Sequence, residues 1–154
     1  MIKDIENITY WALQTMGMYS KDALHMIMRT GMAETGFRHI KQMGNGPALG
    51  FFQVEPKTIA DTMDNYVKYR PEIENSLIEL GYAESDVAYR VMSNIALQVA
   101  FCRLKYRRDK FALPSHNNLE DQAKYWKRVY NTELGKGTIK HFVDANKDYK
   151  IVGF

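Results

Sequence analysis

One acidic residue, Glu34, stands at the end of an apolar helical pattern and directly before a tight turn, Thr35-Gly36-Phe37. Gly36 allows the backbone to reverse sharply at this point. The negative end of a helix disfavours ionisation of a nearby carboxyl group, so its pKa is expected to be raised. A carboxylic acid that keeps its proton near neutral pH can act as a general acid. We therefore predict that Glu34 is a catalytic proton donor.

The segment after this acid contains a second group of residues suited to ligand binding. Gly44-Asn45-Gly46-Pro47 is a strong turn signal, and the chain then continues as Gly50-Phe51-Phe52-Gln53-Val54. We expect residues 51–54 to form a short strand or an extended segment that returns toward Glu34. The uncharged amide of Gln53 is suited to hydrogen bonds with a sugar hydroxyl or acetamido group.

The elements that must position these residues are predicted to be mainly helical. Apolar spacing and capping signals predict helices over residues 3–16, 21–34, 56–62, 66–80, 86–106, 119–130 and 138–145. Ser20 is the expected N-cap of the helix that carries Glu34. The fold class is therefore mainly α, with at most a small β element near residues 36–54. We find no repeat or linker, so residues 1–154 are expected to form a single domain.

Composition limits the classes of function. Of the 154 residues, 45% are hydrophobic and 25% are charged, and the net charge is +3. This mild basic excess favours approach to an anionic polymer such as a cell wall and does not indicate a nucleic-acid partner. The basic residues between 103 and 108 are interpreted as a solvated helix end. The single cysteine, Cys102, lies in an apolar run and is expected to be a buried, inert thiol. Four scattered histidines predict no metal site.

The N-terminal residues predict the route of synthesis. Met1-Ile2-Lys3-Asp4-Ile5-Glu6 carries acids where a signal peptide has a basic region followed by an apolar core. No uninterrupted apolar stretch reaches the length needed to span a bilayer. We therefore expect synthesis in the cytoplasm without a signal peptide and no membrane insertion.

Four segments in the correct order resemble the motifs of the lysozyme-like soluble lytic transglycosylase family. They are Glu34-Thr35-Gly36-Phe37, Gly50-Phe51-Phe52-Gln53-Val54-Glu55-Pro56, Asn94-Ile95-Ala96-Leu97-Gln98-Val99-Ala100 and Val129-Tyr130-Asn131-Thr132. The family shows Glu-Ser-Gly-Phe, Gly-Leu-Met-Gln-Ile-Met-Pro, Asn-Ile-x-x-Gly and Ala-Tyr-Asn-Ala-Gly at these places. The resemblance covers roughly residues 23–137. Gln98 departs from the family's glycine, and Thr132 departs from its small residue.

The resemblance implies a lysozyme-like fold, a peptidoglycan glycan strand as partner, and no cofactor. It implies that Glu34 is the general acid that later acts as base. Tyr130 and Asn131 are expected across the cleft, where they bind the sugar or position its acetamido group. Gln53, Gly50 and Phe52 are expected to line the sugar subsites. The small size and the missing export signal favour a phage lysin, which acts on the wall after holin-type release or from a virion, in company with other lysis or virion proteins.

Three alternatives remain open. A hydrolase would need a second carboxylate, and Glu55 and Asp61 are the nearest acids downstream of Glu34. The absence of an obvious partner favours the transglycosylase route, in which the 6-hydroxyl of muramic acid displaces the leaving group. The Glu-Thr-Gly triplet at residues 34–36 is also similar to that of family-19 chitinases. The departures at Gln98 and Thr132 favour a third reading, a non-catalytic wall-binding or virion protein.

Overall fold

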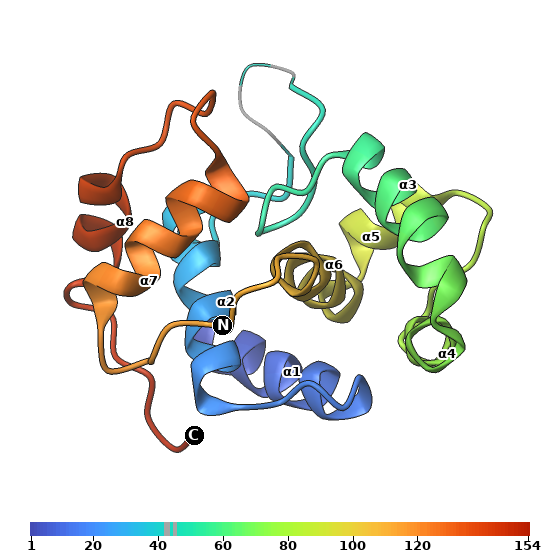
Figure 1. Cartoon of the computed structure of the whole chain (residues 1–154), viewed down its shortest axis with the longest axis horizontal. Helices are drawn as coiled ribbons and strands as arrows, with labels where there is room; N and C mark the ends of the chain where they lie inside the picture. The colour runs from blue at the N-terminus through green and yellow to red at the C-terminus, as the bar shows by residue number, and fades with distance from the viewer. Residues whose placement is uncertain (42–43, 45) are drawn as a thin grey trace.

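A computed structural model describes residues 1–41, 44 and 46–154 (Figure 1). In chain order its elements are α1 (Ile2–Thr15), α2 (Lys21–Glu34), α3 (Pro56–Asn65), the 3-10 helix η2 (Val67–Tyr69), α4 (Pro71–Glu79), α5 (Val87–Ser93), α6 (Ile95–Arg107), α7 (Leu119–Tyr125), the π-helix η3 (Trp126–Asn131) and α8 (Ile139–Asn146). The predicted turn at residues 44–47 includes Asn45, which lies outside the described residues. The prediction of a mainly α fold is confirmed.

The β structure is minimal within these residues. Instead of a strand over residues 51–54, two isolated antiparallel bridges join Lys41 to Leu49 and Leu49 to Val54. The segment nevertheless returns to the end of α2, because the Thr35 hydroxyl donates a 2.7 Å hydrogen bond to the Phe51 carbonyl oxygen. The ring of Phe37 also meets the rings of Phe51 and Phe52 edge to face. The return segment is therefore fixed beside Glu34.

Helix α6 forms the centre of the molecule. It contacts α1, α2, α3, α5 and η3, and Figure 1 shows it between α1 and α2 on one side and α3 and α5 on the other. Its residues 96–104 are all buried. All except Gln98 and Arg103 are apolar, as expected for a helix surrounded by other elements. The prediction that the Cys102 thiol is buried is confirmed, and burial raises its pKa to about 12.

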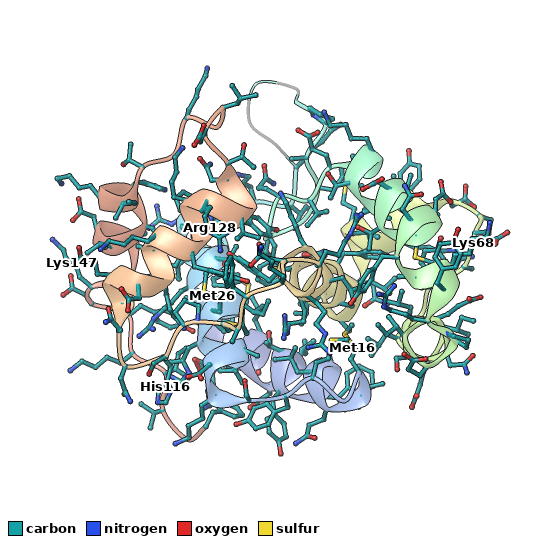
Figure 2. All side chains as sticks on the ribbon, in the orientation of Figure 1. Met16, Met26, Lys68, His116, Arg128 and Lys147 are labelled. Carbon is teal, nitrogen blue, oxygen red and sulfur yellow. The ribbon has the colours of Figure 1, made fainter. Side chains whose placement is uncertain are left out.

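Helix α2 begins and ends as the sequence predicts. The Ser20 hydroxyl accepts a 3.0 Å hydrogen bond from the Ala23 backbone nitrogen, and the helix ends at Glu34. Near its end, a Cβ added at Gly31 would lie 2.2 Å from the Phe37 ring. The glycine therefore allows the turn after Glu34 to pack directly on the helix. Met26, labelled in Figure 2, is fully buried on this helix.

Two predicted helices are each divided in the structure. The predicted helix 66–80 is divided into η2 and α4, because Pro71 has no backbone N–H to continue a helix and begins a new one. The predicted helix 86–106 is divided at Asn94, whose backbone is extended (φ −130°, ψ 103°). The Asn94 side chain accepts a 3.1 Å hydrogen bond from the Leu97 nitrogen and so caps α6.

No helix within the described part of the chain combines the length and apolar character that crossing a bilayer requires.

Candidate active site

A cavity of about 500 Å³ brings most of the predicted site residues together. Its lining includes Glu34 at the end of α2, Gln53 and Glu55 before α3, Lys105 on α6, and Tyr130 and Asn131 at the end of η3. These residues are far apart in the sequence. Helices α2 and α6, the π-helix and the segment before α3 therefore place two acids, two amides and a lysine around one space.

Glu34 is half-buried at this cavity. Its Oε1 accepts a 3.1 Å hydrogen bond from the indole nitrogen of Trp126, the one donor to this carboxylate among the described residues. Burial raises the pKa of the Glu34 carboxyl above its ordinary value. The Trp126 hydrogen bond and the charges of Lys105 and His141 act in the opposite direction but do not outweigh burial. The carboxyl group is therefore suited to hold a proton and to release it to a bound substrate.

The indole that holds this carboxyl group is itself fixed. Trp126 is 1% exposed, and its ring packs on Phe142 with 5.2 Å between centroids. A Cβ added at Gly137 would lie 2.5 Å from the indole, so glycine allows this close approach. On α8, directly before Phe142, His141 Nε2 donates a 2.7 Å hydrogen bond to the Ala33 carbonyl oxygen. Helix α8 thus anchors both the tryptophan and the end of α2.

Lys105 places a positive charge in the same cavity. Its Nζ donates a 2.8 Å hydrogen bond to the Tyr130 carbonyl oxygen and lies 4.1 Å from the centroid of the Tyr130 ring. Burial lowers the pKa of this ammonium group, and the carboxylates of Glu34 and Glu55 act in the opposite direction. The ammonium is therefore placed to stabilise a carboxylate that forms at Glu34.

Another part of the cavity wall is a π-helix and the turn that follows it. The sequence predicts an ordinary helix over residues 119–130, whereas residues 126–131 form a π-helix, a rare conformation often found at functional sites. The Lys127 ammonium donates to Asn131 Oδ1 (2.8 Å), the Thr132 carbonyl (2.8 Å) and the Gly135 carbonyl (3.0 Å). The Asn131 oxygen is thereby occupied, so its amide nitrogen is the group able to donate to a ligand.

Thr132 has an unusual backbone conformation in this wall. Its φ of 69° and ψ of 168° fall in a region that is normally open only to glycine. For a β-branched residue this is a strained conformation, and such strain gathers at functional sites. Thr132, the residue that differs from the fourth motif, therefore lines the cavity in a strained backbone conformation.

The Tyr130 side chain is fixed by contacts within the protein. The side chain is 3% exposed and stacks on Tyr106, with centroids 5.1 Å apart. Its hydroxyl donates a 2.6 Å hydrogen bond to the Phe52 carbonyl oxygen. That hydroxyl is therefore occupied in fixing the return segment beside Glu34. Tyr130 is a positioning residue that also contributes to the cavity wall.

Substitution of Tyr130 by phenylalanine is expected to destabilise the protein by about 1–3 kcal/mol. The ring would keep its packing on Tyr106, but the buried Phe52 carbonyl would lose its donor. Chemical unfolding of native protein and variant measures the difference. A matched control is Tyr69→Phe, because the Tyr69 side chain is exposed. If Tyr130→Phe were no less stable than Tyr69→Phe, the hydroxyl would not hold the return segment.

Three of the predicted site residues do not line the cavity. The Phe52 side chain is 0% exposed and packs on Phe37, so it cannot contact a sugar. Gly50 is buried and faces Gln98, and a Cβ there would lie 2.6 Å from that side chain. Asp61 is exposed and forms a 2.7 Å ion pair with Arg108. Of the two candidate second carboxylates, the cavity therefore includes only Glu55.

The departure at Gln98 has a structural reason. Its side-chain oxygen accepts a 2.9 Å hydrogen bond from the Phe51 nitrogen. Its amide nitrogen donates to the carbonyl oxygens of Val91 (2.8 Å) and Met92 (3.1 Å). Gln98 therefore joins α6 to the end of α5 and to the turn that precedes Gln53. The residue that departs from the family motif supports the return segment.

The site also contains residues that the sequence analysis did not single out. Lys105 belongs to the basic cluster predicted to be a solvated helix end, but in the structure it lines the cavity. Trp126 lies four residues before Tyr130, a spacing that places the two rings near one face of a helix. The sequence signal for Lys105 is a lysine within an apolar helix. The signal for Trp126 is a tryptophan one helical turn before the tyrosine of the fourth motif.

A cavity of about 540 Å³ elsewhere is slightly larger but lacks these features. It lies beside α3 and is lined by apolar side chains such as Ile59 and Met63 and by the exposed carboxylates of Asp64, Glu74 and Glu84. It includes none of the predicted site residues and no buried acid. The Glu34 cavity is therefore the candidate active site.

Comparison of the chain with protein-family models, curated proteins and solved structures gave no match. Within the described residues, no group of three or more histidine, cysteine or acidic side chains is placed to hold a metal ion.

Proposed function

We propose that the protein is a muramidase that cleaves the β-1,4 bond between the N-acetylmuramic acid and N-acetylglucosamine units of peptidoglycan, acting as a lytic transglycosylase. The observation that carries the proposal is the half-buried Glu34 carboxyl with a raised pKa at a polar cavity. The four ordered motifs support it, and three of them contribute residues to the cavity wall. The amides of Gln53 and Asn131 are suited to bind the hydroxyl and acetamido groups of the sugars.

In the proposed reaction, Glu34 first donates its proton to the glycosidic oxygen as the bond from that oxygen to the muramic acid C1 breaks. The Glu34 carboxylate then accepts the proton of the muramic acid 6-hydroxyl while the 6-oxygen bonds to C1. A 1,6-anhydro ring results, and no water is consumed. The Trp126 hydrogen bond and the Lys105 charge stabilise the carboxylate between the two steps.

Hydrolysis is the second candidate, and the position of Glu55 favours it. This carboxylate lies at the same cavity as Glu34, and its side chain is 34% exposed. A carboxylate across the cavity can activate water for attack at C1. The hydrolytic route would leave the acid role of Glu34 unchanged and make Glu55 essential.

The two routes differ in the sugar ends they create. Purified peptidoglycan and chitin oligomers are incubated with the protein, and soluble fragments and new reducing ends are counted together. A transglycosylase releases muropeptides from peptidoglycan without a matching rise in reducing ends, because the anhydro ring has none. One reducing end for each cut supports hydrolysis, and cleavage confined to chitin oligomers supports the chitinase alternative. Failure to cut either polymer would contradict an enzymatic role.

The proposed context is lysis of a bacterial wall by a phage protein, reached by holin-type release from the cytoplasm or from a virion. The net charge of +3 favours approach to an anionic wall. Other lysis or virion proteins are the expected protein partners.

Substitution of Lys105 by methionine is expected to move the alkaline limb of the kcat/KM profile to higher pH. The Lys105 charge lowers the pKa of Glu34, so its removal raises that pKa further. The proton of the acid is then kept to a higher pH, and activity falls later as pH rises. Rates over a pH series measure the shift. Lys57→Met is the matched control, because Lys57 lines the same cavity but is 84% exposed. A shift to lower pH in Lys105→Met, or equal shifts in the two variants, would contradict the assignment.

A further inference from the structure

A second cavity, of about 250 Å³, lies beside the C-terminal half of α6. Helix α6 contributes Arg103 and Arg107, which are one turn apart, and residues 109–113 form the opposite side. Lys110 adds a third positive charge to the lining. The same helix that presents Lys105 to the Glu34 cavity therefore presents two arginines to a separate, smaller space.

Arg103 has an unusual environment for a charged side chain. It is 8% exposed, and no hydrogen bond or ion pair to it is found among the described residues. Its Nε is fully buried without a partner. Burial lowers the pKa of this guanidinium, and the neighbouring Arg107 charge acts in the same direction. A largely buried charge without a partner is costly to a folded protein, so an anion bound beside Arg103 would stabilise the folded state. The expectation that this cluster is a solvated helix end is wrong for Arg103.

The carboxylate at the cavity is already engaged elsewhere. Asp109 accepts hydrogen bonds from Arg128 (3.1 and 3.3 Å), from the Tyr125 hydroxyl (3.1 Å) and from the Phe111 nitrogen (3.1 Å). Arg128 is labelled in Figure 2, on the π-helix that follows α7. The Tyr106 hydroxyl is hydrogen-bonded to the Thr30 hydroxyl. It carries no charge, because burial raises its pKa well above the ordinary value. The positive charge at the cavity is therefore not balanced by its own lining.

We propose that this cavity binds a phosphate group through Arg103, Arg107 and Lys110. Guanidinium groups present several N–H donors in a planar fork that matches the oxygens of phosphate. Three cations favour a phosphate over a singly charged carboxylate. The phosphate is either free inorganic phosphate or a phosphodiester unit of a larger molecule, and both present the same oxygens. The proposal does not depend on glycan cleavage at Glu34.

Thermal unfolding at constant ionic strength tests the proposal, with inorganic phosphate replacing chloride. Native protein is expected to show a saturable rise in Tm, of about 5–10 °C when phosphate is present at about 100 times its Kd. Arg103→Met is expected to weaken phosphate binding by about 10-fold or more. Without phosphate, Arg103→Met is expected to have a higher Tm than native protein, because an unpaired buried charge is removed. This variant therefore remains folded and informative.

Lys124→Met serves as the control, because Lys124 lies on α7 away from this cavity and its side chain is 58% exposed. It should keep the phosphate response of native protein. A second arm uses the phosphodiester of two glycerols. If both probes bind equally, the cavity accepts the phosphodiester unit of a larger molecule. If only inorganic phosphate binds, the ligand is the free phosphate ion. Absence of a saturable response to either probe, or an equal response in Arg103→Met, would overturn the proposal.

Discussion

Substitution of Glu34 by glutamine is expected to lower the rate of glycan cleavage by about 10²–10⁴-fold. Glutamine keeps the size of the side chain, and its oxygen can still accept the hydrogen bond from Trp126. It has no acidic proton to give to a glycosidic oxygen. Release of soluble fragments from purified peptidoglycan, measured with native protein and variant at equal concentration, gives the ratio of rates.

Glu34→Gln is also expected to change how the stability of the protein depends on pH, and the stability measurement checks that the variant is folded. Because burial raises the folded-state pKa of Glu34, the folded protein binds this proton more tightly than the unfolded chain. The extra stability that this proton gives to the folded protein is fully present at pH values below the ordinary pKa of a glutamate. It is lost as the pH rises through the raised pKa of Glu34 in the folded protein. Glutamine removes this dependence, so near pH 7 the variant should be at least as stable as native protein.

Two further carboxylates provide the controls for this experiment. Asp61→Asn should keep native activity, because Asp61 is exposed and paired with Arg108 outside the cavity. Glu55→Gln separates the two chemical routes, since only hydrolysis needs this carboxylate at the cavity. A Glu34→Gln variant with native activity would contradict the proton-donor role. Loss of activity in Asp61→Asn comparable to that in Glu34→Gln would place the chemistry elsewhere.

Substitution of Gln98 by leucine is expected to destabilise the protein by about 2–4 kcal/mol. The buried Phe51 nitrogen would lose its acceptor, and the Met92 carbonyl oxygen would lose its donor. The Val91 carbonyl oxygen would lose one of its two donors and keep the 3.3 Å hydrogen bond from the Asn94 nitrogen. Leucine is close in size, so the loss reports hydrogen bonds more than packing. We also expect reduced cleavage, because the Phe51 turn positions Gln53 at the cavity. Denaturant unfolding measures the stability change.

Gln14→Leu is the matched control for this substitution. Gln14 is exposed on α1, and its side chain donates one hydrogen bond to the Tyr10 hydroxyl. A surface change of this kind is expected to alter stability by less than about 0.5 kcal/mol. If Gln98→Leu were as stable as Gln14→Leu, Gln98 would not support the return segment, and its departure from the family motif would have no structural reason.

The position of Glu34 could be predicted because local chemistry determines it. Ser20 caps the helix, apolar residues at helical spacing form its buried face, and Gly36 permits the turn that ends it. Each of these signals lies within a few residues of the feature it specifies. The confirmed mainly α fold rests on the same kind of local pattern.

The parts that could not be predicted depend on contacts between distant segments. The break at Asn94 falls inside a continuous helical spacing, and only packing decides that its side chain caps α6 rather than facing solvent. A lysine or arginine in an apolar helix has the same sequence signature whether its end reaches water, as at Arg107, or is buried, as at Arg103. The hydrogen bond of Tyr130 to Phe52 likewise joins residues that are 78 positions apart in the sequence.

The most direct test of the proposed function is mass spectrometry of the soluble fragments released from purified peptidoglycan by native protein and by Glu34→Gln. We predict fragments that end in 1,6-anhydro-muramic acid with native protein, and almost none with the variant under conditions in which both are folded. Fragments with added water would instead indicate a Glu34-dependent hydrolase. The absence of any Glu34-dependent fragment, across walls of several bacterial types, would contradict the assignment of this cavity as a peptidoglycan-cleaving site.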